Sequence, residues 1–151
     1  MKTLTLLGVC AAALALTAAA PAPKVTAADA WCRPAPTGAM AGGCYVTLTA
    51  GVDDRLVAVE TTAAARGEIH TMSMDGGVMR MRKLADGLAL PAGKAVALKP
   101  GADHIMVIGP KIALTEGAQV PLTLKFQKAK PVKVTAVVKM PPKPAMSGMH
   151  H

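Results

Sequence analysis

Aromatic side chains are nearly absent from this sequence of 151 residues, since Trp31, Tyr45 and Phe126 are the only ones. Proteins that bind nucleic acid by base stacking need several aromatic faces. A protein of that class is therefore not expected, although the formal net charge is +8. The length suits one domain with a hydrophobic core better than two.

The sequence also lacks an apolar run long enough to cross a bilayer comfortably. The uncharged segment Leu4–Leu16 follows Lys2 and precedes small residues, which is typical of a secretory signal peptide. We expect residues 1–19 to be removed on export to the periplasm, leaving no membrane span. Cys10 could instead mark a lipoprotein, but Val9 before it is not a small residue, so we expect Cys10 to leave with the signal.

Cysteine is scarce in the exported part, where only Cys32 and Cys44 remain. An oxidising compartment converts paired cysteines to disulfides. Their spacing is not that of a C-x-x-C motif, so a redox enzyme is not favoured. We expect a Cys32–Cys44 disulfide between the first two strands, and the alternative is two unpaired buried thiols.

No convincing helical period is present. Short β-branched and apolar segments alternate with Gly and Pro, as in the alternating segment 120–126. The expected strands are 25–33, 44–49, 55–61, 68–74, 78–84, 95–98, 104–108, 120–126 and 132–138. About nine short strands at close spacing indicate an all-β protein, an antiparallel sandwich or barrel over residues 20–139.

Residues 140–151 break this pattern, with three prolines and no alternation. We expect a flexible tail. It carries a cluster of thioethers and imidazoles: Met140, Met146, Met149, His150 and His151. Adjacent imidazoles suit Cu(II), so the tail is a candidate second, weaker copper element. The alternative is a solvated tail that does not bind copper.

Methionine is the abundant residue, with ten in the chain. Asp75-Gly76 favours a two-residue type I′ hairpin turn. With these residues at its centre, His70 would face Met81 and Met72 would face Met79. Side chains alternate along a strand. One face of the hairpin would therefore carry His70, Met72, Met74, Met79 and Met81.

A second pair, His104 and Met106, also points to one side of its strand, because the two residues are two positions apart. Thioether sulfur is soft and suits Cu(I) rather than Zn²⁺, Mg²⁺ or Ca²⁺. Unlike cysteine, methionine forms no disulfide in an oxidising compartment. The alternatives are that the methionines fill the core and that the histidines are ordinary hydrogen-bonded residues.

The same residues carry a family resemblance. The matching motifs are Trp31-Cys32-Arg33, Asp54-Arg55-Leu56, His70, Met81 and His104-Ile105-Met106. From Trp31 to Val138 the chain resembles the periplasmic copper chaperones called PCuAC. The spacing from Met81 to His104 is one residue longer than is usual in that family, and we place the extra residue in the loop near 84–87.

The resemblance implies a cupredoxin-like Greek-key β-sandwich. It implies Cu(I) bound by His70, Met81, His104 and Met106. Met72 and Met79 are then expected to be neighbours of the site rather than ligands. It also implies delivery of copper to an acceptor protein, a cytochrome c oxidase subunit or another copper protein of oxidase assembly.

Two other functions for a copper site, and one without copper, compete with delivery. A copper-sequestering resistance protein would share the site and lack a specific acceptor. A copper enzyme is not expected, because two histidines and two methionines leave no open coordination position, and no acid–base or nucleophile set is evident. A copper-free sandwich used in adhesion would not retain copper.

Overall fold

The computed structural model describes residues 20 and 22–141, so the expected signal peptide and most of the expected tail lie outside the described residues. Every regular element in this part is a strand. The ten strands are β1 (Val25–Cys32), β2 (Ala41–Ala50), β3 (Asp54–Glu60), β4 (Ala64–Asp75), β5 (Val78–Lys83), β6 (Leu88–Leu90), β7 (Ala95–Ala97), β8 (His104–Pro110), β9 (Gln119–Phe126) and β10 (Val132–Val138). Over the same residues, no helix could cross a membrane.

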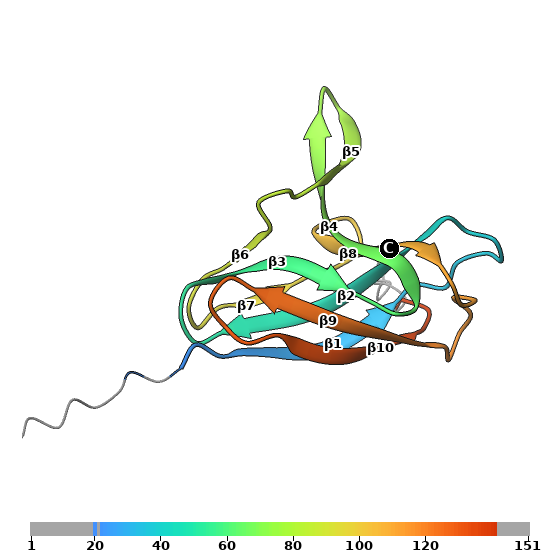
Figure 1. The fold of residues 1–151 in the computed structure, drawn as a ribbon. Helices are drawn as coiled ribbons and strands as arrows, with labels where there is room; N and C mark the ends of the chain where they lie inside the picture. The colour runs from blue at the N-terminus through green and yellow to red at the C-terminus, as the bar shows by residue number, and fades with distance from the viewer. Residues whose placement is uncertain (1–19, 21, 142–151) are drawn as a thin grey trace, which may run out of the picture.

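The strands form one hydrogen-bonded sheet that folds onto itself as a sandwich (Figure 1). The strand order is β5-β4-β8-β2-β1-β10-β9-β3-β6, and β7 pairs with β2. Inward residues alternate along the strands, as in β9, where Val120, Leu122 and Leu124 are fully buried. The expected all-β sandwich is therefore confirmed. Because β1 pairs with β10 and β3 pairs with β9, some neighbouring strands of the sheet lie far apart in the sequence.

Two details differ from the expectation. The structure has ten strands rather than about nine, because Leu88–Leu90 forms a short strand beside β3. The segment Leu88–Leu90 contains no β-branched or aromatic residue and is followed by Pro91, so the sequence gives little strand signal there. The sheet is also not wholly antiparallel, since β1 and β10 run parallel, with Trp31 opposite Val137. The side-chain pattern of a strand does not specify the direction of its neighbour.

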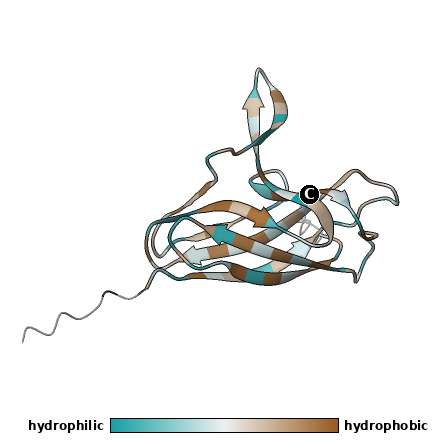
Figure 2. Cartoon of the chain, in the orientation of Figure 1, coloured by the Kyte–Doolittle hydropathy of each residue, from teal (hydrophilic) through white to brown (hydrophobic). Residues whose placement is uncertain are grey.

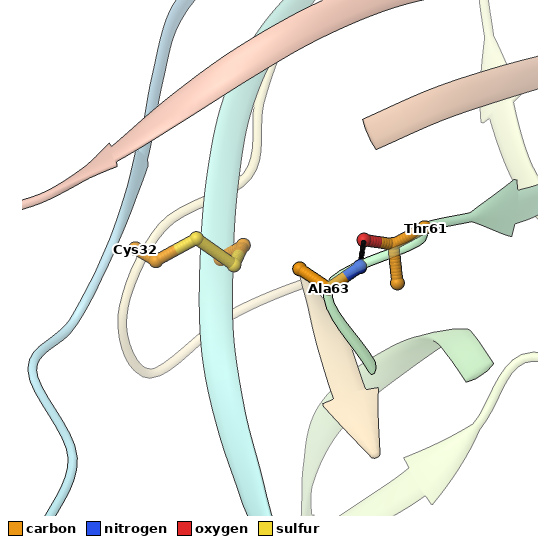
Figure 3. The surroundings of a disulfide bond; sticks show 4 residues. Cys32, Thr61 and Ala63 are labelled. Atoms are coloured by element: carbon orange, nitrogen blue, oxygen red, sulfur yellow. Dashed lines mark hydrogen bonds between the residues drawn. A yellow bond between two sulfur atoms is a disulfide. The ribbon is translucent and has the colours of Figure 1, made fainter. Parts of the chain in front are cut away.

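The structure joins Cys32 and Cys44 by a disulfide in the core (Figure 3). The two residues lie directly opposite each other on β1 and β2, and neither is exposed to solvent. Close by, in the segment that leads into β4, the Ala63 backbone N–H donates to Thr61 Oγ1, and the distance between the two atoms is 3.1 Å. The bridge therefore joins β1 to β2 covalently inside the core.

We expect the exported protein to contain no free thiol when it is analysed by mass spectrometry under non-reducing conditions. The bridge closes a short loop, and a loop of this size stabilises a fold by roughly 3 kcal/mol. Two thiols that react with an alkylating agent in periplasmic protein would contradict this prediction.

The Asp54-Arg55-Leu56 motif has a structural role. The buried Asp54 carboxylate accepts backbone hydrogen bonds from Arg55 (2.7 Å), Lys128 (2.9 Å) and Ala129 (2.8 Å). Arg55 Nη1 donates to the carbonyl oxygens of residues 86 and 87, at 3.2 and 3.3 Å. Leu56 is fully buried in the core. The motif thus holds the loop between β5 and β6 against the sandwich.

Candidate metal centre

The β4–β5 hairpin turns at Gly76-Gly77, not at Asp75-Gly76 as expected. Both glycines have positive φ, 58° and 80°. A type I′ turn requires positive φ at both central positions, which glycine adopts without steric cost. Asp75 instead stays in the strand opposite Val78.

This turn shifts the register by two residues, so the expected partners were wrong while the expected face was right. Met72 faces Met81, Met74 faces Met79, and His70 faces Lys83. Since a two-residue shift preserves the alternation, the histidine and the four methionines still share one face of the hairpin. Met72, rather than His70, is the residue opposite Met81.

His70 lies where β4 changes partner. Over Ala64–His70, β4 pairs with β8, and over His70–Asp75 it pairs with β5. Beyond His70, no other strand of the described residues pairs with the hairpin, and Figure 1 shows it standing away from the sandwich. His70 faces His104 across β4 and β8, and the two ring centroids are 5.9 Å apart.

The candidate ligands occupy the outer face of this layer. Ile69 and Ile105 point into the core, so their neighbours His70 and His104 point outward. Met106 faces Glu68 in the same register, and therefore lies on this face as well. The structure thus brings the two His-containing segments together, as predicted.

His104 presents a bare nitrogen to Met81. Its Nδ1–H donates to the Ala102 carbonyl oxygen at 2.8 Å, so in the neutral form of the ring Nε2 carries the free lone pair. Nε2 lies 3.1 Å from Met81 Sδ. Two lone pairs do not bond each other, but a tetrahedral d¹⁰ ion would separate nitrogen and sulfur ligands by about 3.5 Å. The contact is therefore close to the spacing of two ligands of one soft ion.

His70 presents a second bare nitrogen. Its Nε2 lies 2.8 Å from Glu68 Oε2, and an ionised carboxylate can only accept, so Nε2 carries the proton. In the neutral form of the ring Nδ1 then carries the free lone pair, and it is buried with no hydrogen-bond partner among the described residues. An unsatisfied buried acceptor is costly unless a ligand uses it, and a metal ion would satisfy this one.

Glu68 is the functional residue that the sequence interpretation missed. Its Oε1 accepts from Arg66 Nε at 2.9 Å and Lys83 Nζ at 3.3 Å. The hydrogen bond from His70, with those from Arg66 and Lys83, outweighs the effect of burial and lowers the pKa of Glu68 to about 2. The sequence did contain one indication of this role: Glu68 lies two residues before His70, so both side chains lie on one face of the strand.

We expect Glu68→Ala to weaken Cu(I) binding by roughly tenfold, because carboxylates that hold a ligand histidine typically contribute 10–100-fold to metal affinity. Glu68→Gln should retain more of the affinity, since its amide oxygen can still accept from Nε2–H. Nitrogen NMR of the metal-free protein should show a loss of the fixed His70 tautomer in the alanine variant only. Equal affinities for the wild type and both variants would contradict the prediction.

The methionines do not fill the core. Among the described residues, the core cluster contains no methionine. Met74, Met79 and Met81 are 69%, 48% and 50% exposed, and Figure 2 shows apolar residues on the hairpin away from the sandwich. The core-filling alternative is therefore wrong for these residues. The described part of the chain also has no cluster of three His, Cys, Asp or Glu that could hold a metal ion, so the thioethers are needed to complete a site.

The longer spacing between Met81 and His104 does not separate them. Residues 84–87 form the loop between β5 and β6, outside both ligand-bearing strands. Met81 stays in β5 and reaches His104. The geometry therefore tolerates the departure from the usual family spacing.

A family described as putative lipoprotein LpqE-like matches residues 25–138. A putative lipoprotein, Lxx21020 of Leifsonia xyli subsp. xyli (strain CTCB07), is 30% identical over 139 residues, which cover 89% of this chain and 84% of that protein. The family match spans the whole sandwich, from β1 to β10.

Solved PCuAC structures have the same fold. The copper-bound PCuAC domain from PmoF2 gives a TM-score of 0.64 at 22% identity, covering 81% of this chain and 97% of that domain. Apo-DR1885 from Deinococcus radiodurans gives 0.57 at 28% identity, covering 91% and 96%. With the family match and the sandwich described above, the chain belongs to the LpqE-like family, a family of the PCuAC type.

Proposed function

We propose that this protein is a copper chaperone that carries one Cu(I) ion between His70, Met81, His104 and Met106. The observation that best supports this proposal is that His70 Nδ1 and His104 Nε2 are both available as ligands on one outer face. His104 Nε2 lies 3.1 Å from Met81 Sδ. All four ligands are neutral and the two thioethers are soft, a set that favours Cu(I).

The ligand set also supports release of the ion. Four neutral ligands leave the charge of Cu(I) uncompensated, and the carboxylate of the nearby Glu68 is already paired with Arg66 and Lys83. Half of the Met81 side chain is exposed on the projecting hairpin. An acceptor could therefore replace Met81 first, so that copper passes by ligand exchange without becoming free.

Similar proteins support copper as the ion that is carried. The PmoF2 domain is copper-bound, and a second solved form, CuI-DR1885, is 27% identical and covers 82% of this chain, with a TM-score of 0.56. We propose that the acceptor is a cytochrome c oxidase subunit or another oxidase-assembly copper protein, as the PCuAC resemblance implies. Deletion of this protein should then lower oxidase activity, and copper supplementation should restore it.

We also propose that the protein acts after export to the periplasm. The signal-like segment at 1–19 supports export, as do the family and the relative, both described as putative lipoproteins. The mass of the mature N-terminus distinguishes a protein with a cleaved signal peptide from a lipoprotein. Cleavage after residue 18 or 19 gives an unmodified chain, whereas a lipoprotein would begin at a lipid-bearing Cys10.

X-ray absorption of the Cu(I)-loaded protein tests the site. We expect nitrogen and sulfur in the same coordination shell, at one copper per chain in a titration against a competing chelator. A shell made only of nitrogen would overturn the ligand assignment. The four-ligand set leaves no open position for a substrate, so we propose no catalysis.

The tail forms a separate proposal. Met140 is described and 63% exposed, whereas Met146, Met149, His150 and His151 lie outside the described residues. We expect a chain that ends at Lys139 to keep the Cu(I) site and to lose Cu(II) binding, measured by titration in each oxidation state. Ordering a free segment costs affinity, so the tail should be the weaker element. Unchanged Cu(II) binding would remove the tail from the mechanism.

A further inference from the structure

We infer that Met74 and Met79 form a second, weaker Cu(I) site at the hairpin tip, which captures the ion and passes it to the main site. This inference rests on the proposed function. The two residues are named here the tip pair. They face each other directly, one residue away from the Asp75–Val78 pair that flanks the turn.

The register brings the tip-pair side chains close. In a hairpin with a two-residue turn, the flanking pair is hydrogen-bonded and the next pair is not. Side chains of a non-hydrogen-bonded pair are the closest pairs on an antiparallel ladder. Methionine is unbranched and flexible, so two thioethers at these positions can turn toward one ion.

The same register connects the tip pair to the main site. Met72 and Met81 form the next non-hydrogen-bonded pair on this face, about 7 Å along the strands. Met81 Sδ in turn lies 3.1 Å from His104 Nε2. The thioethers of Met72, Met74, Met79 and Met81 therefore form a row of soft ligands, spaced closely enough for their long side chains to share one ion. Cu(I) can move along it by gaining one sulfur before losing another, with no change of oxidation state.

Charge on the hairpin is segregated in a way that suits a cation on this face. The opposite face carries Arg80 and Arg82, and both pair with Asp75, at 3.6 and 3.0 Å. Alternation keeps these two cations on the other side of the hairpin from the methionines. Lys83 lies on the methionine face, opposite His70, but its ammonium pairs with Glu68 at 3.3 Å, away from the tip pair. Met74 is 69% exposed and Met79 is 48% exposed. Their side chains therefore face solvent, and core packing does not explain why methionine occupies these two positions.

The test uses mature protein with ¹³C-labelled methionine methyl groups, titrated with Cu(I). The first equivalent should shift the His70 and His104 ring signals, and the second should shift the Met74 and Met79 methyl signals. In stopped-flow loading from the Cu(I)–bicinchoninate complex, the double variant Met74→Leu/Met79→Leu should load about tenfold more slowly, because it loses the raised local concentration of the ion. Its affinity for the first ion should change less than about threefold, since leucine conserves the volume.

Met40→Leu is the matched control, because Met40 is 81% exposed and precedes β2, away from the hairpin. It should load at the wild-type rate. Tip-pair methyl signals that stay unchanged between one and two equivalents would overturn the inference, and so would wild-type loading by the double variant. Unshifted His70 and His104 rings would instead show that the proposed main site has failed, and the tip pair would then have no site to supply.

Discussion

Replacing His104 with alanine is expected to lower Cu(I) affinity by more than about a hundredfold, since losing a mere hydrogen-bond partner of a ligand already costs 10–100-fold. His104 is 6% exposed, and its Nδ1–H is held by the Ala102 carbonyl oxygen. Burial and this hydrogen bond therefore hold the ring in place. Competition with bicinchoninate measures the affinity directly.

The matched control for His104→Ala is Thr71→Ala. Thr71 lies next to His70 in β4 but points to the opposite face. This variant should bind Cu(I) as the wild type does. If His104→Ala lost less than about threefold in affinity while its thermal unfolding matched that of the wild type, His104 would not be a ligand.

Replacing Asp54 with alanine is expected to lower the free energy of unfolding by about 3 kcal/mol or more, since each buried donor left without a partner costs roughly 1–3 kcal/mol. Three backbone N–H groups would lose their acceptor, at residues 55, 128 and 129. Asp54→Asn should cost less, because one side-chain oxygen remains. Urea unfolding followed by circular dichroism measures both variants, and a loss below about 1 kcal/mol for the alanine variant would contradict the role of Asp54.

The same residue should give acid sensitivity. Burial raises the pKa of Asp54, but the backbone hydrogen bonds from Arg55, Ala129 and Lys128, with the Lys128 charge, together outweigh it and lower the pKa from 3.8. A lowered folded-state pKa adds stability above the unfolded value, and this stability is lost as the pH falls through the folded value. The difference in stability between the wild type and Asp54→Ala should therefore shrink below about pH 3.8.

The shared face of His70 and the methionines could be predicted from the sequence, although the hairpin register could not. Period-two alternation is unchanged by a two-residue shift, so the face did not depend on choosing the right turn. Choosing between Asp75-Gly76 and Gly76-Gly77 required the backbone angles. Two glycines in a row make both turns sterically accessible, and the pattern of side chains alone does not decide between them.

Glu68 and the parallel β1–β10 pair illustrate what lies beyond such patterns. A carboxylate is a poor ligand for Cu(I), so a search for soft ligands passes over Glu68, which acts on His70 rather than on the ion. The pairing of β1 with β10 joins segments more than a hundred residues apart. It depends on how the whole chain folds back, which no local signal records.

That parallel pairing also decides where the chain leaves the sandwich. Val138 lies beside Cys32, Cys32 beside Cys44, and Cys44 beside Ile105, the neighbour of His104. Three strand spacings separate the end of β10 from the metal face, about 14 Å. The residues that follow, 140–151, span up to about 40 Å when extended. Any ion held there is tethered within reach of the main site at a millimolar effective concentration, so its transfer would be a unimolecular step whose rate is independent of dilution.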